Sequence, residues 1–280
     1  MQDFSRVGGH VSTAGGLFRG IEKAESIGAE VMQIFGSSPR SWNRRAITDE
    51  EIEKFNTLRE EKLIAKVYIH ACYLINFGSN LRESLERSKN SLLADLELAD
   101  KINAYGVVVH PGSLKDGTNI SDISENIKLV LENFEGNAKI LIENSAGGGS
   151  SVPRTIDEIA EMVRLVNDNR VEVCIDTAHL WGFGIDISTE EKVDKLAEEL
   201  ENKLSGVNVP IVHFNDSKAR LGSLLDRHEN IGNGQIGIEG LREIASHNYF
   251  KNSDLVLEVP GLFKNGPDSE NIHILKDLII

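Results

Sequence analysis

Residues 107–112 read VVVHPG, a run of three valines that ends on a histidine and is followed by a turn-forming proline and glycine. Successive β-branched residues are typical of a strand, and an apolar run without alternation indicates a strand that is buried on both faces. His110 then stands at the carboxyl end of this strand. The same order, an apolar run closed by a polar side chain, recurs along the chain and indicates a repeating unit.

Eight runs rich in Val and Ile have this strand character. They are RVGGHV (6–11), AEVMQIF (29–35), AKVYIHA (65–71), AYGVVVH (104–110), AKILIE (138–143), VEVCID (171–176), VPIVHF (209–214) and DLVLEV (254–259). Segments with helical periodicity lie between them. Three pairs fit the capping box that begins a helix, namely Thr48 with Glu51, Thr155 with Glu158, and Ser188 with Glu191.

This alternation of strands and helices predicts a parallel sheet with right-handed crossovers. Eight repeats predict a closed α/β fold, the (β/α)8 TIM barrel, which typically takes about 250 residues as one unit. An open doubly wound sheet is the alternative, but the first turn, GGHVSTAGG (8–16), lacks the dinucleotide-binding glycine spacing, and no Walker A motif occurs. No linker-like segment interrupts the pattern, so we expect one domain over residues 1–280.

The composition, with 40% hydrophobic and 26% charged residues, is that of a globular protein. A net charge of -14 argues against a protein that coats nucleic acid through a large basic face, although it is compatible with a local basic groove. No apolar run is long enough to span a membrane, and the N-terminus lacks the features of a signal peptide. We therefore expect a cytoplasmic protein with no membrane partner, in which Cys72 and Cys174 are free buried thiols.

The carboxyl ends of the strands of such a barrel meet at one mouth, where the active sites of this fold lie. Polar side chains predicted at this mouth are His10, His70, His110, Glu143, Asp176, His179, His213 and Glu258, together with Asp226 and His228 from the loop after the seventh strand. Six of the eight histidines in the chain belong to this set, and we expect the other two, His247 and His273, to lie in helices. This clustering favours a functional site over scattered packing residues.

Four carboxylates at one mouth repel one another unless positive charge lies among them. Imidazole mixed with carboxylate suits zinc, manganese or iron, whereas calcium and magnesium prefer oxygen alone. Nine candidate ligands, with His10 left over, are too many for one tetrahedral ion but would serve three ions that share a carboxylate. Such a cluster would carry a net formal charge of about +2, which attracts phosphate and favours phosphodiester cleavage.

The motifs around these residues resemble those of the endonuclease IV family of apurinic/apyrimidinic endonucleases. They are HACYLIN (70–76), HPGS (110–113), ENSAGGGS (143–150), CIDTAH (174–179), HFNDSK (213–218), DRHENIGNG (226–234) and LEVP (257–260). The resemblance covers nearly the whole chain. It implies a zinc-dependent TIM-barrel enzyme of base-excision repair that hydrolyses the DNA phosphodiester 5′ to an abasic site, leaving a 3′-hydroxyl and a 5′-deoxyribose phosphate.

Carried over residue by residue, the resemblance implies three zinc ions, with Mn²⁺ as an alternative at some positions. The first zinc is held by His70, His110 and Glu143, the second by Glu143, Asp176, His213 and Glu258, and the third by His179, Asp226 and His228. Glu143 bridges two ions and is the implied catalytic residue, because it helps to place the nucleophile.

The same resemblance implies a double-stranded DNA partner with abasic sites. Arg40 in SPRSW and the pair Tyr73 and Leu74 match loop residues with which the family enters DNA at the lesion. Lys218 and Arg220, which follow the seventh strand, add positive charge, and a solvated basic loop is the simpler interpretation of these cations.

Three positions depart from the pattern expected for the family. Cys72 replaces a proline or small polar residue, Leu224 replaces an arginine, and Val259 replaces a threonine. None of them is a candidate ligand, and Leu224 removes one possible DNA contact.

Two other functions remain open from the sequence. A metal-dependent sugar isomerase or epimerase on the same barrel would use fewer ligands and would have no evident use for His179, Asp226 and His228. A non-enzymatic DNA-binding or metal-storing protein would not need every ligand to be retained. We expect an endonuclease that acts as a monomer.

Overall fold

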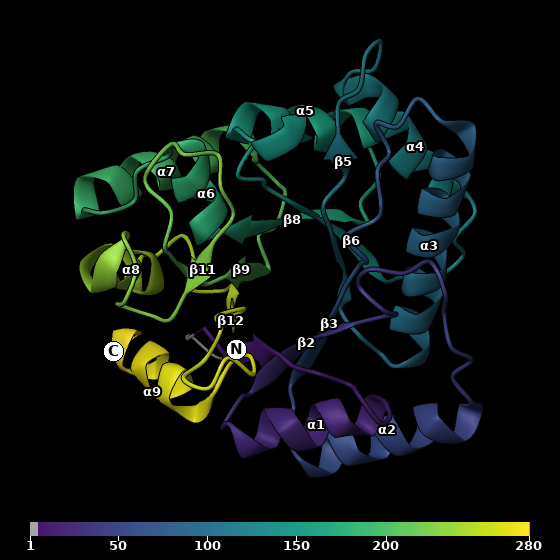
Figure 1. The fold of residues 1–280 in the computed structure, drawn as a ribbon, viewed down its shortest axis with the longest axis horizontal. Coiled ribbons are helices and arrows are strands. Elements are labelled where there is room, and N and C mark those ends of the chain that lie inside the picture. The colour runs from purple at the N-terminus through teal and green to yellow at the C-terminus, as the bar shows by residue number, and fades with distance from the viewer. Residues whose placement is uncertain (1–4, 280) are drawn as a thin grey trace.

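All eight predicted apolar runs form strands, and these strands close into a barrel in the computed structural model, which describes residues 5–279 (Figure 1). The strands are β1 (Val7–His10), β2 (Val31–Phe35), β3 (Lys66–His70), β4 (Gly106–Val109), β6 (Lys139–Glu143), β8 (Val171–Asp176), β9 (Ile211–His213) and β12 (Asp254–Leu257). Every neighbouring pair is parallel, and the last strand, β12, pairs with the first, β1. The predicted TIM-barrel fold is confirmed.

Helices connect the strands and surround the barrel (Figure 1). They are α1 (Leu17–Ser26), α2 (Asp49–Glu61), α3 (Arg82–Lys101), α4 (Ile120–Glu132), α5 (Ile156–Val166), α6 (Thr177–Phe183), α7 (Glu190–Lys203), α8 (Gly237–Ser246) and α9 (Ser269–Leu278). The loops after the strands form two small antiparallel ribbons. One pairs β5 (Gly112–Ser113) with β7 (Ser151–Val152), which follows the 3₁₀ turn η1 (Gly148–Ser150), and the other pairs β10 (Asp216–Ser217) with β11 (His228–Glu229).

The apolar core has two layers, as a barrel covered by helices requires. The larger layer packs between the strands and the helices. The smaller layer fills the inside of the barrel with side chains that include Tyr68, Val108, Leu141 and Ile211. The buried hydroxyl of Tyr68 donates a hydrogen bond to Oδ2 of Asp254 at 2.6 Å, so this polar group in the barrel interior is satisfied.

Two of the three predicted helix starts are confirmed as N-caps, but the carboxylate half of the capping box is absent, because Glu51 accepts from Leu17 N–H and Glu158 from Arg154 N–H. Thr48 and Thr155 are the N-caps of α2 and α5, and each accepts a hydrogen bond from the backbone N–H three residues later. The prediction at Ser188 is wrong, because Thr189 is the N-cap of α7 and makes no side-chain capping bond. The hydroxyl of Ser188 instead accepts a bond from Nζ of Lys192.

The prediction for the two cysteines is confirmed, and the prediction for the two histidines outside the mouth is right for one of them. Cys72 and Cys174 are free and buried, and burial raises the pKa of Cys174 to about 12. His273 lies in α9, whereas His247 follows α8 as its extended C-cap, so its placement inside a helix was wrong. None of the described helices has the length and apolar character that crossing a membrane requires.

Candidate metal centre

The polar side chains predicted at the strand ends converge on one mouth of the barrel. Five of them are the last residues of β1, β3, β6, β8 and β9, namely His10, His70, Glu143, Asp176 and His213. Two directly follow β4 and β12, namely His110 and Glu258. The other three lie beyond the strand ends: His179 in α6, Asp226 in the loop before β11, and His228 in β11. Nine of them fall into three groups, numbered below by the ion that each is predicted to hold.

The first group consists of His70, His110 and Glu143. Nε2 of His70 and Nε2 of His110 each lie 3.2 Å from Oε2 of Glu143, and this buried oxygen has no hydrogen-bond partner among the described residues. Two ligand atoms about 2.0–2.1 Å from one tetrahedral zinc are about 3.3 Å apart. The spacing in the first group is therefore that of atoms that share an ion.

The second group consists of Glu143, Asp176, His213 and Glu258, and it offers one ligand atom from each residue within 4.8 Å of the others. Nδ1 of His213 lies 2.9 Å from Oε1 of Glu143 and 3.5 Å from Oε2 of Glu258. Glu143 thus turns Oε2 toward the first group and Oε1 toward the second. This is the arrangement of a carboxylate that can bridge two ions.

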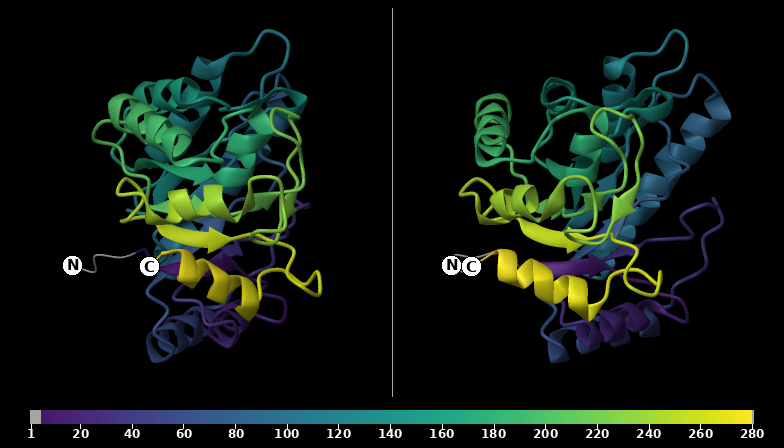
Figure 2. Two further views of the ribbon diagram at one scale, coloured as in Figure 1. Left: turned by 90° about the vertical axis from the view of Figure 1, so that its left-hand side faces the viewer. Right: turned by 60° about the vertical axis from the view of Figure 1, so that its left-hand side comes forward.

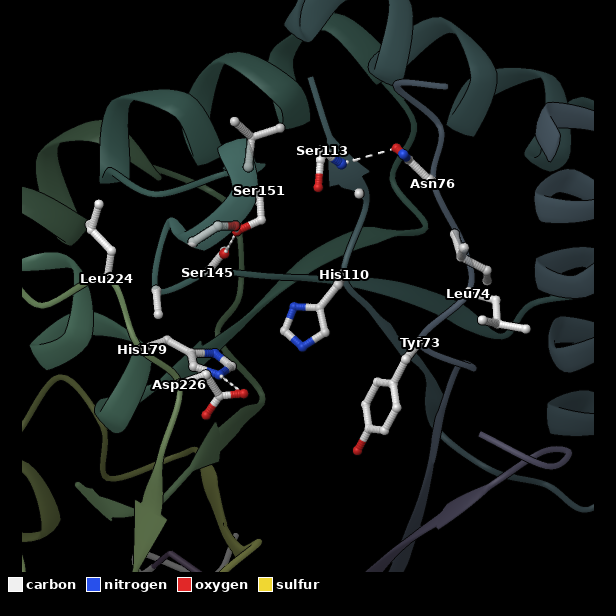
Figure 3. Close-up of a pocket in the computed structure, with 15 residues that line it drawn as sticks. Tyr73, Leu74, Asn76, His110, Ser113, Ser145, Ser151, His179, Leu224 and Asp226 are labelled. Atoms are coloured by element: carbon white, nitrogen blue, oxygen red, sulfur yellow. Dashed lines mark hydrogen bonds and ion pairs between the residues drawn. The ribbon is translucent and has the colours of Figure 1, made fainter. Parts of the chain in front are cut away.

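The third group consists of His179, Asp226 and His228. Nε2 of His179 lies 3.3 Å from Oδ2 of Asp226, and Nε2 of His228 lies 3.1 Å from Oδ1 of the same carboxylate (Figure 3 shows the first pair). Nε2 of His228 is also 3.5 Å from Oδ2 of Asp176. Asp176 therefore lies between the second and third groups, a position that the sequence did not indicate.

Four of the five histidines in these groups, all except His110, have a hydrogen bond at the outer ring nitrogen, as is usual for metal-binding imidazoles. Outer nitrogens and their acceptors are Nδ1 of His70 with Ala71 O at 2.7 Å, Nδ1 of His179 with Asn144 O at 3.0 Å, Nδ1 of His228 with Glu258 O at 3.3 Å, and Nε2 of His213 with Oε1 of Gln33 at 2.9 Å. When each outer nitrogen donates its proton, the inner nitrogen presents a lone pair to the mouth. The residues present could therefore hold divalent metal ions.

The charges at the site also favour a bound cation. Partial desolvation of the half-exposed Asp226 opposes its ionisation, but hydrogen bonds from His179 and His228 outweigh this effect and hold the pKa of Asp226 below its usual range. Although burial favours a neutral ring in His228, Asp176 and Asp226 together raise its pKa to about 9. Without a metal, protons on the imidazoles must offset the carboxylates, and a divalent cation would take over that role.

Gln33 belongs to the site, although the sequence analysis did not select it. Its amide is fully buried at the middle of β2, where Nε2 donates to Oε1 of Glu258 at 2.7 Å and lies 2.9 Å from Nδ1 of His10. His10, the histidine left over from the ligand set, lies 3.0 Å from Oε1 of Glu258. The available signal was a single amide within the apolar run VMQIF.

The predicted DNA-contacting side chains lie around the same mouth. Tyr73 and Leu74 follow β3, are 54% and 36% exposed, and line a cleft of about 460 Å³ with His110, His179 and Asp226 (Figure 3). Exposed Arg40 lies in the loop between β2 and α2. That loop is anchored by Arg44, whose Nη2 is 2.6 Å from Oδ1 of the buried Asp95 on α3.

The other predicted cations differ in whether a carboxylate pairs with them. Arg220 is exposed in the loop between β10 and β11, whereas Nζ of Lys218 lies 3.1 Å from Oε2 of Glu229. Arg45, in the basic stretch after Arg40, is paired with Glu51. Arg45 is also exposed, so it fits the simpler interpretation, a solvated basic loop.

The three departures from the family pattern have separate surroundings. Cys72 is buried with Sγ 3.6 Å from Oγ of Ser91, and Val259 is buried beside the mouth. Leu224 has a positive φ of 57° and is 44% exposed at the wall of the cleft. At this position the cleft has an apolar wall in place of a cation.

Large exposed apolar side chains gather around this mouth. Of nine such residues in the described part of the chain, eight lie in loops that follow the carboxyl ends of strands, namely Tyr73, Leu74, Leu81, Leu221, Leu224, Leu225, Leu262 and Phe263. The ninth, Leu63, lies between α2 and β3 at the opposite end of the barrel. Apolar exposure on this scale at one face is typical of a surface that binds a large partner.

Comparison with known proteins agrees with this architecture. The family model described as "xylose isomerase-like TIM barrel" matches residues 21–277. The chain is 34% identical to a probable endonuclease 4 of Halothermothrix orenii, over 97% of this chain and 99% of the relative, and 32% identical to one of Aquifex aeolicus, over 97% and 96%.

Among solved structures, endonuclease IV from Thermus thermophilus superposes with a TM-score of 0.88 at 34% identity and covers 98% of both chains. A D-tagatose 3-epimerase-like protein superposes with a TM-score of 0.68 at 18% identity, over 98% of this chain and 95% of that one, which shows a shared fold alone. Identity above 30% over almost the whole length distinguishes the first relationship from the second. This chain belongs to the endonuclease IV family of apurinic/apyrimidinic endonucleases.

Proposed function

We propose that this protein hydrolyses the phosphodiester on the 5′ side of an abasic site in double-stranded DNA, giving a 3′-hydroxyl and a 5′-deoxyribose phosphate. The nine mouth residues hold three zinc ions, with Mn²⁺ as an alternative at some positions. Residues 1–280 act as a single domain and a monomer in base-excision repair. The observation that carries this proposal is the convergence of the three groups on shared carboxylates.

Charge supports a phosphate substrate. Four carboxylates, Glu143, Asp176, Asp226 and Glu258, carry -4, so three divalent ions leave a site of about +2 in a mouth whose walls are partly apolar. Bound metal ions would supply Lewis acidity, which lowers the pKa of water and offsets the charge that develops on the phosphate oxygens.

The protein side chains set the geometry of that chemistry. Glu143 fixes the separation of the first two groups, because its two oxygens face His70 and His213 on opposite sides. Hydrogen bonds from Gln33 and Asn215 hold Glu258 and Asp176, respectively, at 2.7 Å and 2.8 Å. A pre-arranged site of this kind has little reorganisation to undergo when the phosphate arrives.

The loops explain why the lesion is accessible. A nucleotide without its base has lost its pairing and much of its stacking, so turning it out of the helix costs less. Tyr73 and Leu74 are exposed beside the cleft and can occupy the space that the displaced sugar leaves. Arg40, Lys218 and Arg220 would contact phosphates on either side.

A sugar epimerase is the competing function, since solved epimerases share the fold. A small sugar gives no role to the third group or to eight exposed apolar side chains around the mouth. The exposed surface therefore favours a polymer substrate.

One experiment separates these functions. The purified protein is analysed for metal and then incubated with a duplex that carries one abasic-site analogue, with the matched intact duplex, and with free ketohexoses. The proposal expects about three zinc ions per chain and incision only of the abasic duplex, on the 5′ side. Epimerisation of a sugar without incision would contradict it.

A further inference from the structure

A short turn after β12 carries the most exposed aromatic side chain of the described residues. Phe263 is 83% exposed, and its neighbours are Leu262, at 51%, and Lys264. In the left view of Figure 2 the arrow of β12 points to the right, and the yellow loop that follows it reaches the same side as the green loop between β10 and β11. The turn therefore belongs to the rim of the mouth.

Backbone hydrogen bonds hold the turn at its base, although its tip is exposed. The backbone N–H of Leu262 donates to Oδ2 of Asp268 at 2.6 Å, and Oδ1 of the same carboxylate caps α9. Gly266 N–H donates to Pro260 O at 3.0 Å. Gly261 and Gly266 have φ values of 73° and 85°, which a glycine adopts without strain. A partner that binds here does not have to order the turn first.

The base of the turn is tied to the metal-site residues. Gly261 N–H donates to Oδ1 of Asn230 at 2.9 Å, two residues after His228. Glu258 lies five residues before Phe263 in the chain, and its carbonyl accepts the outer nitrogen of His228. Phe263 is thus presented at a fixed place relative to the second and third groups.

Nothing in the described part of the chain covers this aromatic ring or neutralises the cation beside it. No carboxylate within residues 5–279 forms an ion pair with Lys264. An exposed ring beside a free cation fits a polyanion that also has flat apolar faces, which is the chemistry of DNA bases on a phosphate backbone. The chain has a net charge of -14, so an unpaired cation on the rim is a local exception that favours contact with an anion.

From these features we infer that Phe263 is a second stacking contact to the opened duplex, supported by a phosphate contact from Lys264. Phe263 meets the DNA on the β12 side of the mouth, while Tyr73 and Leu74 meet it on the β3 side. The unpaired base opposite the lesion offers the exposed face that the ring covers. This inference rests on the proposed function, because it requires an abasic duplex at the mouth.

The test compares single-turnover incision of an abasic-analogue duplex over a range of enzyme concentrations. Phe263→Ala is expected to raise the concentration that gives half the maximal rate by about 5- to 150-fold, while the maximal rate and the zinc content stay unchanged. Phe263→Trp, which keeps a ring, is expected to stay within about threefold of the unaltered protein. Leu63→Ala is the matched control, since Leu63 is 81% exposed at the opposite end of the barrel.

Failure of the Phe263 contact and failure of the proposed endonuclease function give different results. If the unaltered protein fails to incise, the proposed function fails before any variant is compared. If it incises and Phe263→Ala behaves as Leu63→Ala does, the stacking contact is refuted and the function stands. An equal loss of affinity for intact duplex would refute contact with the unpaired base. Sedimentation of the unaltered protein as a dimer and of Phe263→Ala as a monomer would show that a second copy covers the ring, which also refutes the inference.

Discussion

Gln33 accepts a hydrogen bond at Oε1 from Nε2 of His213, at 2.9 Å, and this contact leaves Nδ1 of the imidazole facing Glu143. The two residues come from β2 and β9, which are not neighbours in the barrel. One amide therefore selects the ring tautomer of His213 and, through Nε2, orients Glu258. Both effects act on the second group.

Replacing this amide tests its role. Gln33→Met keeps the size of the side chain but removes its hydrogen bonds to His213 and Glu258, so affinity for metal at the second group should fall by about 10- to 100-fold. Elemental analysis after timed exposure to a chelator measures the loss. Gln235→Met, at an exposed position, is the control. Retention of metal by Gln33→Met equal to that of the control would show that Gln33 merely fills space.

Glu143→Gln should abolish most activity and leave the fold intact. The amide has nearly the same shape as the carboxylate, but it lacks the charge that two ions would share, so the single-turnover rate should fall at least about 100-fold. Circular dichroism and thermal melting with and without zinc check the fold. A variant that cleaves at nearly the original rate would remove Glu143 from the proposed bridge.

Metal and protons should compete for the site. His228 has a pKa of about 9, so in the metal-free protein at pH 7 its ring carries a proton that must leave before Nε2 can bind an ion. The affinity for zinc should therefore rise as the pH increases toward about 9. Zinc titration of chelator-treated protein in a weak buffer should release protons at pH 7 and restore activity. Full turnover by protein that elemental analysis finds free of metal would contradict this dependence.

Tyr73→Ala should weaken recognition of the lesion without disturbing the metal. Removal of the stacking ring corresponds to about 1–3 kcal/mol, or roughly a 5- to 150-fold rise in the apparent dissociation constant for abasic duplex. Zinc content should remain unchanged, because Tyr73 is not in any of the three groups. Tyr73→Phe keeps the ring and serves as the comparison. Unchanged affinity of Tyr73→Ala for abasic duplex would refute the proposed contact between Tyr73 and the lesion, and it would not affect the proposed metal site.

Salt dependence should identify the phosphate contacts. Neutralising Arg40 or Arg220 with glutamine should lower the slope of log affinity against log salt by about 0.9 for each phosphate that the protein no longer neutralises. Lys62→Gln is the control, since Lys62 pairs with Glu25 and precedes Leu63 at the opposite end of the barrel. Slopes that match that of the control would show that both arginines are solvated surface charges and contact no phosphate.

The sequence predicted the barrel because its signals are local. Each buried parallel strand is a continuous apolar run, as in VVVHPG, and the polar residue that ends the run reaches the mouth in any closed barrel. For the same reason seven of the ten polar residues at the mouth follow from the strand pattern, whereas His179, Asp226 and His228 come from segments beyond the strand ends. The predicted groupings rested on family resemblance, and the distances around Glu143 and Asp226 are compatible with them.

What the sequence missed depends on contacts between distant segments. Gln33 gains its role only when β2, β9 and β12 surround one point, and Asp176 gains a second neighbour, His228, from a loop. The start of α7 was misplaced by one residue because Ser188 and Thr189 both suit a cap, and only the backbone shows which one serves. Exposure of Phe263 likewise depends on how a loop folds, which periodicity does not describe.

The pairing of β12 with β1 has a consequence for how the protein is made. Residues of the first and third groups are present once the chain has been synthesised to His228, but the second group lacks Glu258 until β12 emerges and joins the first strand. A nascent chain therefore displays an incomplete set of ligands for the time that the ribosome needs to add about thirty residues. If the second group holds an ion as proposed, that ion can be bound by all four residues only after β12 has joined β1 and closed the barrel.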